Sequence, residues 1–230
     1  QTGQPADEHT LFMIASNSKA VTGIAMAKLA YEKKLSLDDK VQKWIPEFKL
    51  ADARVSGMVN LRDVLSHRIS FETFQGDFCH WATNTSSNEV IQRMAKVQPV
   101  YEFRDHYGYC NAGYVVAGEV IRRASGMNWE DYVSRNFFEK MGMTETRPLS
   151  RGFSSSANHC QPYTLYYDTL CSLKAVNVDN LAPAASICSS VADWSKWVLM
   201  VLGEGTYNGK EVVPEAAIRM SMEPLTIEGS

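Results

Sequence analysis

Two short motifs contain the residue types that nucleophilic catalysis requires. In Ser16-Asn17-Ser18-Lys19, a serine is followed three residues later by a lysine, and this spacing puts both side chains on one face of a helix. The lysine amine can then take the proton of the serine hydroxyl, which is otherwise a weak nucleophile, provided that burial lowers the lysine pKa. A helix N-terminus favours the negative charge that develops when Ser16 attacks a carbonyl, and the Ser16 N–H is a natural oxyanion donor.

The first motif has a simpler interpretation, in which Ser16 caps a helix and Lys19 is solvated. A four-residue motif with two fixed positions is expected by chance about once in a chain of this length. However, residues 17–32 are apolar on almost every side, and a lysine in such a segment is rarely a surface residue. The surrounding sequence therefore favours catalysis.

The second motif is Tyr109-Cys110-Asn111. In an extended loop, residues i and i+2 point to the same side, so the phenol and the amide are predicted to face one cleft. We expect a nearby Lys19 cation to lower the pKa of Tyr109, which would let the phenol pass a proton to a leaving amine. Asn111 can donate to and accept from a substrate amide. Alternatively, Tyr109 packs and Asn111 caps the following helix, a role that leaves its amide nitrogen available.

Helices are predicted to position both motifs. The segment 17–32 is expected to be a central helix, because it is apolar almost all round. Capping residues and helical spacing predict further short helices over about 36–145, and the predicted first residues or caps are Ser36, Asn60, Ser86, Asn111 and Asn128. Few segments resemble strands, so the chain is predicted to be mainly α.

The later part of the chain has a different pattern. Residues 147–189 contain serine, asparagine and proline between short apolar pieces, which predicts long loops with one hairpin. Helices are predicted again over 190–222. The first of them is expected to carry four apolar side chains inward, namely Trp194, Trp197, Val198 and Val201.

Composition excludes several classes of protein. The 230 residues are 45% hydrophobic and 21% charged, unlike a disordered chain or a disulfide-dense miniprotein. The net charge is −3 and no basic run occurs, so nucleic acid is not an expected partner. No apolar stretch reaches the about 20 residues of a membrane span. The cysteines and histidines lack zinc-ligand spacing, so no metal is predicted, and His67 is interpreted as a loop residue bonded to backbone.

The two motifs and the sequence around them resemble the serine β-lactamase and penicillin-binding protein superfamily, in particular its class C β-lactamase-like branch. That branch has S-x-x-K, then Y-x-N, then K-T-G or H-x-G on a sheet-edge strand. Five further segments match its pattern: 35–41, 65–68, 112–114, 141–144 and 189–193. The resemblance runs from about residue 10 to 224, which makes it far more specific than either motif alone.

The resemblance implies a β-lactamase/transpeptidase-like α+β fold and acyl transfer through an acyl-enzyme. Ser16 would be the nucleophile, Lys19 its base partner, Tyr109 the proton shuttle and Asn111 the residue that holds the acyl-side amide of the substrate. The substrate would be a small-molecule or peptide-like amide, ester or β-lactam, with a peptidase or esterase favoured over a dedicated β-lactamase. No metal or organic cofactor is implied, and the family resemblance suggests a periplasmic or extracellular location.

The sequence also departs from the family. No K-T-G or H-x-G follows the Tyr109-Cys110-Asn111 motif, and the early strands that precede the nucleophile helix in the family are absent. We therefore expect residues 1–230 to form one β-lactamase-like region, truncated, without most of the central antiparallel sheet. The missing sheet includes a second oxyanion donor, and losing one such donor costs about 10²–10³ in rate.

This departure leads to three expectations. Turnover by the chain is impaired, the apolar side of the nucleophile helix is exposed, and a homo-oligomer or a complementing chain supplies the sheet. The alternative function is a non-catalytic binding or scaffold protein derived from this fold. The family often has glycine where Ser70 and Ala185-Ser186 stand, so both loops are expected to differ in shape.

Overall fold

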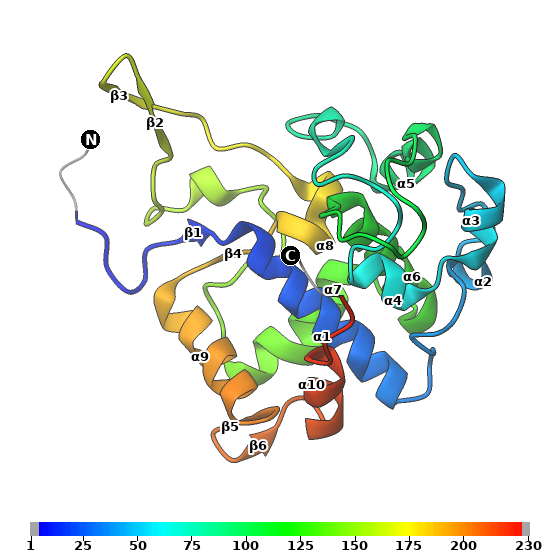
Figure 1. Ribbon diagram of the computed structural model, residues 1–230. Coiled ribbons are helices and arrows are strands. Elements are labelled where there is room, and N and C mark those ends of the chain that lie inside the picture. Colours follow the sequence, from blue (N-terminus) through cyan, green and yellow to red (C-terminus); the bar gives the residue numbers. More distant parts are fainter. Residues whose placement is uncertain (1–4, 227–230) are drawn as a thin grey trace.

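The computed structural model describes residues 5–226, and a long helix runs through the middle of it (Figure 1). This helix, α1 (Ser18–Tyr31), lies within the predicted range 17–32 and follows one turn of 3₁₀ helix at Ala15–Asn17. It packs against α6 (Asn111–Ser125), α8 (Ala182–Ala185) and α10 (Glu215–Ser221). Most residues of α1 are buried as a result, as expected for a helix that is apolar all round.

The remaining helices are shorter, and most begin at a residue with a side-chain cap. They are α2 (Val41–Trp44), α3 (Ala53–Met58), α4 (Leu61–Leu65), α5 (Ser87–Arg93), α7 (Trp129–Val133) and α9 (Val191–Leu202). Asn60 and Ser86 each form a capping box with an acidic residue three positions later, and Ser190 accepts the N–H of Asp193 at the start of α9. These caps satisfy N–H groups that would otherwise lack a partner.

Three helix predictions need correction or extension. The helix predicted to start at Ser36 begins only at Val41, because the N–H of Ser36 donates to Asp39 Oδ2 in a turn that precedes the helix. Cys110, not Asn111, is the N-cap of α6. The Asn111 side chain makes no capping bond, because its Oδ1 accepts a hydrogen bond from Lys19 in α1. The helix predicted to begin after Asn128 starts at Trp129, continues through a π turn over Ser134–Phe138 and ends in a 3₁₀ turn over Glu139–Met141.

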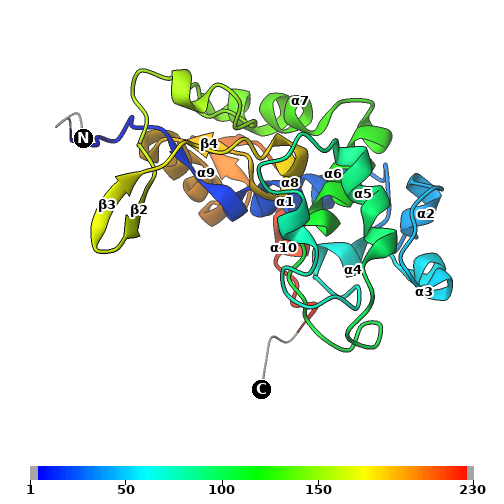
Figure 2. The same cartoon turned by 90° about the horizontal axis from the view of Figure 1, so that it is seen from above.

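Within residues 5–226 the sheets have two strands each, and all are antiparallel. β1 (Phe12–Met13) pairs with β4 (Cys188–Ser189), with Phe12 opposite Ser189. β2 (Tyr163–Tyr166) and β3 (Thr169–Ser172) form the hairpin predicted in the long loop region, and it projects from the helical body (Figure 2). β5 (Thr206–Tyr207) pairs with β6 (Lys210–Glu211). The described chain is thus mainly α with small sheets.

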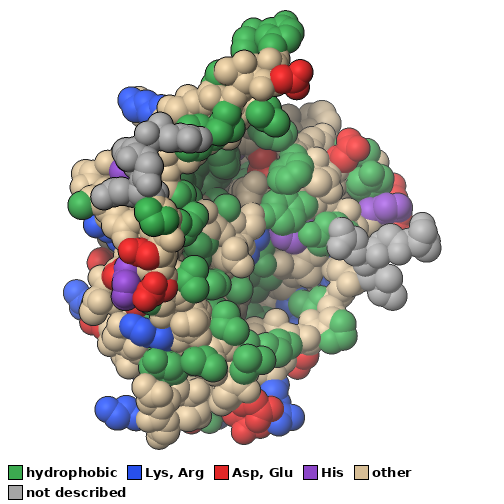
Figure 3. Space-filling model, turned by 90° about the vertical axis from the view of Figure 1, so that its left-hand side faces the viewer, with side chains coloured by type: hydrophobic (Ala, Val, Ile, Leu, Met, Phe, Trp, Pro, Cys, Tyr) green, Lys and Arg blue, Asp and Glu red, His purple; other side chains and the backbone are tan. Residues whose placement is uncertain are grey.

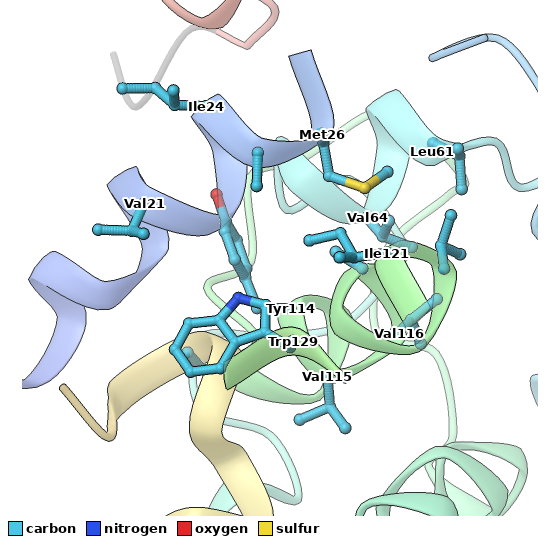
Figure 4. Packing of buried hydrophobic residues seen from close by; sticks show 14 of the residues in the cluster. Val21, Ile24, Met26, Leu61, Val64, Tyr114, Val115, Val116, Ile121 and Trp129 are labelled. Atoms are coloured by element: carbon cyan, nitrogen blue, oxygen red, sulfur yellow. The ribbon is translucent and has the colours of Figure 1, made fainter. Parts of the chain in front are cut away.

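One hydrophobic core joins α1 to α4, α6 and α7. Met26, Val64 and Ile121 face one another where α1, α4 and α6 meet (Figure 4). A Cβ atom at Gly118 would lie 2.2 Å from Cγ of Pro183, so glycine is what allows α6 and α8 to approach this closely. This approach matters for the site, because α8 and α6 both contribute acceptors to it.

An apolar surface on α9 and β1 remains uncovered. Trp197 is buried as predicted, but Val198 is 43% exposed, and the prediction that it points inward was wrong because α9 turns Trp197 and Met200 toward the core. Leu199 is also exposed, and it lines an open hollow with Phe12. Figure 3 shows hydrophobic side chains gathered on this side of the molecule. The exposed apolar side chains of this hollow therefore belong to α9 and β1, whereas α1 itself is largely covered.

In residues 5–226, no helix combines the length and apolar character needed to cross a bilayer. The five cysteines are all free thiols, and two of them, Cys110 and Cys188, are buried.

Candidate active site

The structure brings together all four residues that the sequence predicted for the site. Ser16 Oγ lies 2.6 Å from Tyr109 Oη, although the two residues are 93 positions apart. Lys19 Nζ lies 3.4 Å from Ser16 Oγ and donates to Asn111 Oδ1 at 2.6 Å. The hydroxyl, amine, phenol and amide therefore form one continuous hydrogen-bonded group.

A strained turn presents Ser16 at the surface. Ala15 has φ of 47°, in the left-handed region that costs non-glycine residues about 1–3 kcal/mol. The turn is fastened on both sides, since Ile14 N–H donates to Ile187 O at 2.9 Å and the buried Ser18 Oγ donates to Ala15 O at 2.7 Å. Because the surrounding bonds hold this conformation, Ser16 is exposed just before α1, whose first two residues, Ser18 and Lys19, are buried.

Lys19 is almost fully buried, with 8% of its surface exposed. Its Nζ donates to Asn111 Oδ1 and, at 3.0 Å, to Ala184 O in α8. Burial lowers the pKa of Lys19 to about 8, while the charge of Asp77 acts in the opposite direction. A neutral amine has two N–H donors and one lone pair. The two acceptors occupy both donors, which leaves the lone pair for the Ser16 hydroxyl.

The pKa of Tyr109 differs from the expectation. Burial raises it, the Ser16 hydrogen bond opposes this effect and the Asp77 charge adds to it. The prediction that Lys19 lowers the pKa of Tyr109 was therefore wrong, because desolvation of the phenolate is the larger effect. Tyr109 is a neutral phenol at physiological pH, so it can donate a proton, whereas Lys19 is the group better suited to accept one.

The Tyr109 ring is held by aromatic neighbours, one of which sequence reasoning did not assign to the site. The ring stacks on His67, with centroids 4.7 Å apart and planes at 25°, and meets Phe74 edge-on at 5.1 Å. His67 Nδ1 accepts the N–H of Cys110 at 3.0 Å, as expected for a loop histidine bonded to backbone. Burial and then the Lys19 charge lower the His67 pKa to about 4, so the ring is a neutral support.

Asp77 is the second residue that the sequence did not reveal. It is 4% exposed, and its Oδ2 accepts from Asn111 N at 2.9 Å and from Asn111 Nδ2 at 2.8 Å. Burial raises its pKa, and the hydrogen bonds from Asn111 and the charge of Lys19 oppose that rise. The only local signal is Gly76, which has φ of 81° and marks a turn. No spacing rule connects a loop aspartate to an asparagine 34 residues later.

The two loops in which the family often has glycine, at Ser70 and at Ala185-Ser186, differ in backbone conformation. Ser70 has φ of 74°, a conformation that glycine adopts without strain, so this loop keeps a glycine-type backbone in spite of its serine. Ser186 has φ of −90° and ends α8 in an ordinary conformation. Over the described range 5–226, no group of three His, Cys, Asp or Glu side chains is arranged to hold a metal ion.

A family model described as Beta-lactamase matches residues 1–229 of the sequence. Penicillin-binding protein 4* of Bacillus subtilis strain 168 is 27% identical over 170 residues, which cover 72% of this chain and 36% of that protein. A putative D-alanyl-D-alanine carboxypeptidase of Salmonella gallinarum strain 287/91 is 29% identical over 159 residues, covering 65% of this chain and 37% of that protein. The chain therefore spans little more than a third of the length of these relatives.

Solved structures show the same fold. The octameric penicillin-binding protein homologue from Pyrococcus abyssi has a TM-score of 0.75 and 24% identity, covering 94% of this chain and 49% of that one. The penicillin binding protein from Bacillus halodurans also has a TM-score of 0.75, with 20% identity over 98% of this chain and 67% of that one. The mainly helical chain thus corresponds to part of a penicillin-binding-protein-like α+β fold.

Proposed function

This chain belongs to the Beta-lactamase family, within the serine β-lactamase and penicillin-binding protein superfamily, and we propose from this premise that it is a serine acyl-hydrolase that works through an acyl-enzyme. Ser16 is the nucleophile, Lys19 the base, Tyr109 the proton shuttle and Asn111 the residue that holds the substrate amide. The observation that carries the proposal is the buried Lys19 amine, whose Nζ lies 3.4 Å from Ser16 Oγ and also contacts the two acceptors Asn111 Oδ1 and Ala184 O.

In the proposed acylation, the Ser16 proton passes to Lys19 as Oγ attacks the carbonyl carbon. The tetrahedral intermediate then collapses, the bond to the leaving group breaks, and the leaving group takes a proton from the Tyr109 hydroxyl. The acylated Ser16 Oγ has no proton to relay, so the Lys19 ammonium, which lies 4.5 Å from the centroid of the Tyr109 ring, returns the proton to the phenolate through a water molecule that enters as the leaving group departs. Water hydrolyses the ester at Ser16 by the reverse use of the same groups, as is general for covalent catalysis.

We propose a peptide-like amide or an ester as substrate in preference to a dedicated β-lactam. Relatives are named penicillin-binding protein and putative D-alanyl-D-alanine carboxypeptidase, which supports a peptidase type. The bonds to Asp77 and Lys19 use one N–H and one lone pair of the Asn111 amide, and the second N–H and the second lone pair remain for an incoming amide. We therefore expect the substrate to bind Asn111 without breaking either bond.

Two features support a second candidate function. The first of them also favours low turnover by this chain alone. No K-T-G or H-x-G follows Asn111 in the sequence, so a second oxyanion donor is not evident, and one such donor is worth about 10²–10³ in rate. The apolar surface of α9, with Val198 and Leu199 exposed, is also available for a partner. A non-catalytic binding or scaffold role is therefore the alternative.

Covalent labelling distinguishes the two functions. The chain is treated with a fluorophosphonate probe and with a fluorescent penicillin, and the mass and position of the adduct are determined by mass spectrometry. An enzyme gives one adduct at Ser16, which Ser16→Ala abolishes and Lys19→Ala slows by about 10²–10⁴, the usual contribution of a positioned base. Absence of an adduct, with a folded chain and an adduct on a control penicillin-binding protein, would favour the scaffold.

A further inference from the structure

Asp77 contacts neither Ser16 nor Tyr109 within hydrogen-bond distance, yet it holds the residue that Lys19 uses as an acceptor. Its Oδ2 receives both the main-chain N–H and the side-chain N–H of Asn111. We propose that Asp77 is a positioning residue for the acyl transfer, fixing the Asn111 amide and providing the counter-charge for the Lys19 ammonium that forms when Ser16 is acylated. This inference rests on the proposed function.

The orientation of the Asn111 amide follows from the chemistry of its two neighbours. A carboxylate is only an acceptor, so Asp77 must face the NH₂ end of the amide. The carbonyl end is then turned toward Lys19 Nζ at 2.6 Å. Without Asp77 the amide could flip and present its own donors to the amine, and Lys19 would lose the acceptor that directs its lone pair at Ser16.

The charge of Asp77 also acts on Lys19. Among the causes that shift the pKa of Lys19, burial lowers it and Asp77 is the leading one that raises it. The other titratable groups around the amine are Cys110 and Tyr109, whose pKa values burial raises, Tyr114, whose pKa is also raised, and His67, whose pKa is lowered. All four are neutral near pH 7, so the nearby counter-charge for a protonated Lys19 is Asp77.

The second oxygen of Asp77 makes it possible to test charge and geometry separately. Oδ1 is buried and has no hydrogen-bond partner in the described part of the chain. An asparagine can therefore put its carbonyl oxygen where Oδ2 now accepts from Asn111, with its amide nitrogen in the place of Oδ1. Asp77→Asn removes the charge and keeps the acceptor, whereas Asp77→Ala removes both.

The experiment compares Asp77→Asn, Asp77→Ala and a matched control, Asp193→Asn. Asp193 is 1% exposed and accepts two backbone N–H groups, from Glu145 and Thr146, so it controls for loss of a buried carboxylate. Fluorophosphonate acylation is measured against pH, thermal unfolding checks folding, and lysine labelled with ¹³C at Cε gives the titration midpoint of Lys19, assigned from Lys19→Met.

We expect the Lys19 midpoint and the pH profile of acylation to move to lower pH in Asp77→Asn and to stay in place in Asp193→Asn. Asp77→Ala is expected to lose about 10- to 100-fold in acylation rate, the usual cost of an outer partner that orients a reacting group, and Asp77→Asn to recover most of it. A purely structural role would lower stability without moving the midpoint.

A reciprocal measurement needs no Asp77 variant. The charge of Lys19 lowers the pKa of Asp77, so the Asp77 carboxyl should titrate at higher pH in Lys19→Met than in the parent. An unchanged Asp77 midpoint there, an unchanged Lys19 midpoint in Asp77→Asn, or parental acylation by Asp77→Ala would each overturn the inference. If the parent is not acylated at all, the proposed function fails, and the two titrations still decide whether Asp77 and Lys19 are coupled.

Discussion

Replacing Lys19 with methionine should change how the stability of the protein depends on pH. Burial lowers the pKa of Lys19 from 10.5 to about 8, and this difference corresponds to about 3 kcal/mol of unfolding free energy. The folded state holds the proton less tightly than the unfolded state, so below pH 8 the charged amine destabilises the fold by the full amount. The penalty falls as the pH rises from about 8 toward 10.5, because stability increases with pH wherever the unfolded state binds more protons.

The assay is urea unfolding of the parent and of Lys19→Met from pH 7 to pH 10. Relative to the variant, the parent should gain about 2–3 kcal/mol over this range, on top of a constant offset from the two hydrogen bonds that methionine cannot make. Ser16→Ala keeps the amine and should follow the parent. Parallel curves for the parent and Lys19→Met, or a relative loss of parental stability at high pH, would show that the amine is not destabilised by burial.

Three further outcomes are expected. The rate of probe attachment to Ser16 should rise with pH through about 8, where Lys19 becomes neutral, and fluorescence labelling across a buffer series measures it. Tyr109→Phe keeps the aromatic packing and removes the hydroxyl 2.6 Å from the nucleophile, so transfer to an amide substrate should fall by about 10²-fold or more with an unchanged melting temperature. Gly118→Ala places a methyl 2.2 Å from Pro183 and should destabilise the fold by about 1–3 kcal/mol. Gly23→Ala, whose Cβ has nothing within 4 Å, should instead stabilise it by about 0.5–1 kcal/mol, and urea titrations compare the two.

Local sequence signals predicted the helices well where capping chemistry decides the boundary. The caps at Asn60, Ser86 and Ser190 are present, because each uses only a side chain and N–H groups two or three residues later. The central position of α1 was also predicted, because its residues are apolar on almost every side. Asn111 was an exception, since its side chain forms hydrogen bonds with Lys19 and Asp77 from distant segments.

Features that depend on tertiary burial were not predictable from the sequence. The direction of the Tyr109 pKa shift depends on how far the phenol is desolvated, and neither the chain spacing nor a neighbouring charge determines that. The orientation of Val198 depends on what covers α9. The role of His67 and Asp77 beside the site follows from contacts across 34 to 43 residues, for which a single sequence contains no periodic signal.

The contact between Ser16 and Tyr109 also has a consequence for the order in which the molecule assembles. It closes a loop of 93 residues, which costs about 4 kcal/mol of chain entropy before any contact compensates for it. Such a distant pair meets only after the intervening helices have collapsed around α1. A nascent or partly folded chain therefore has the serine and the lysine without the phenol beside them, and the proposed site forms late, together with the completed core.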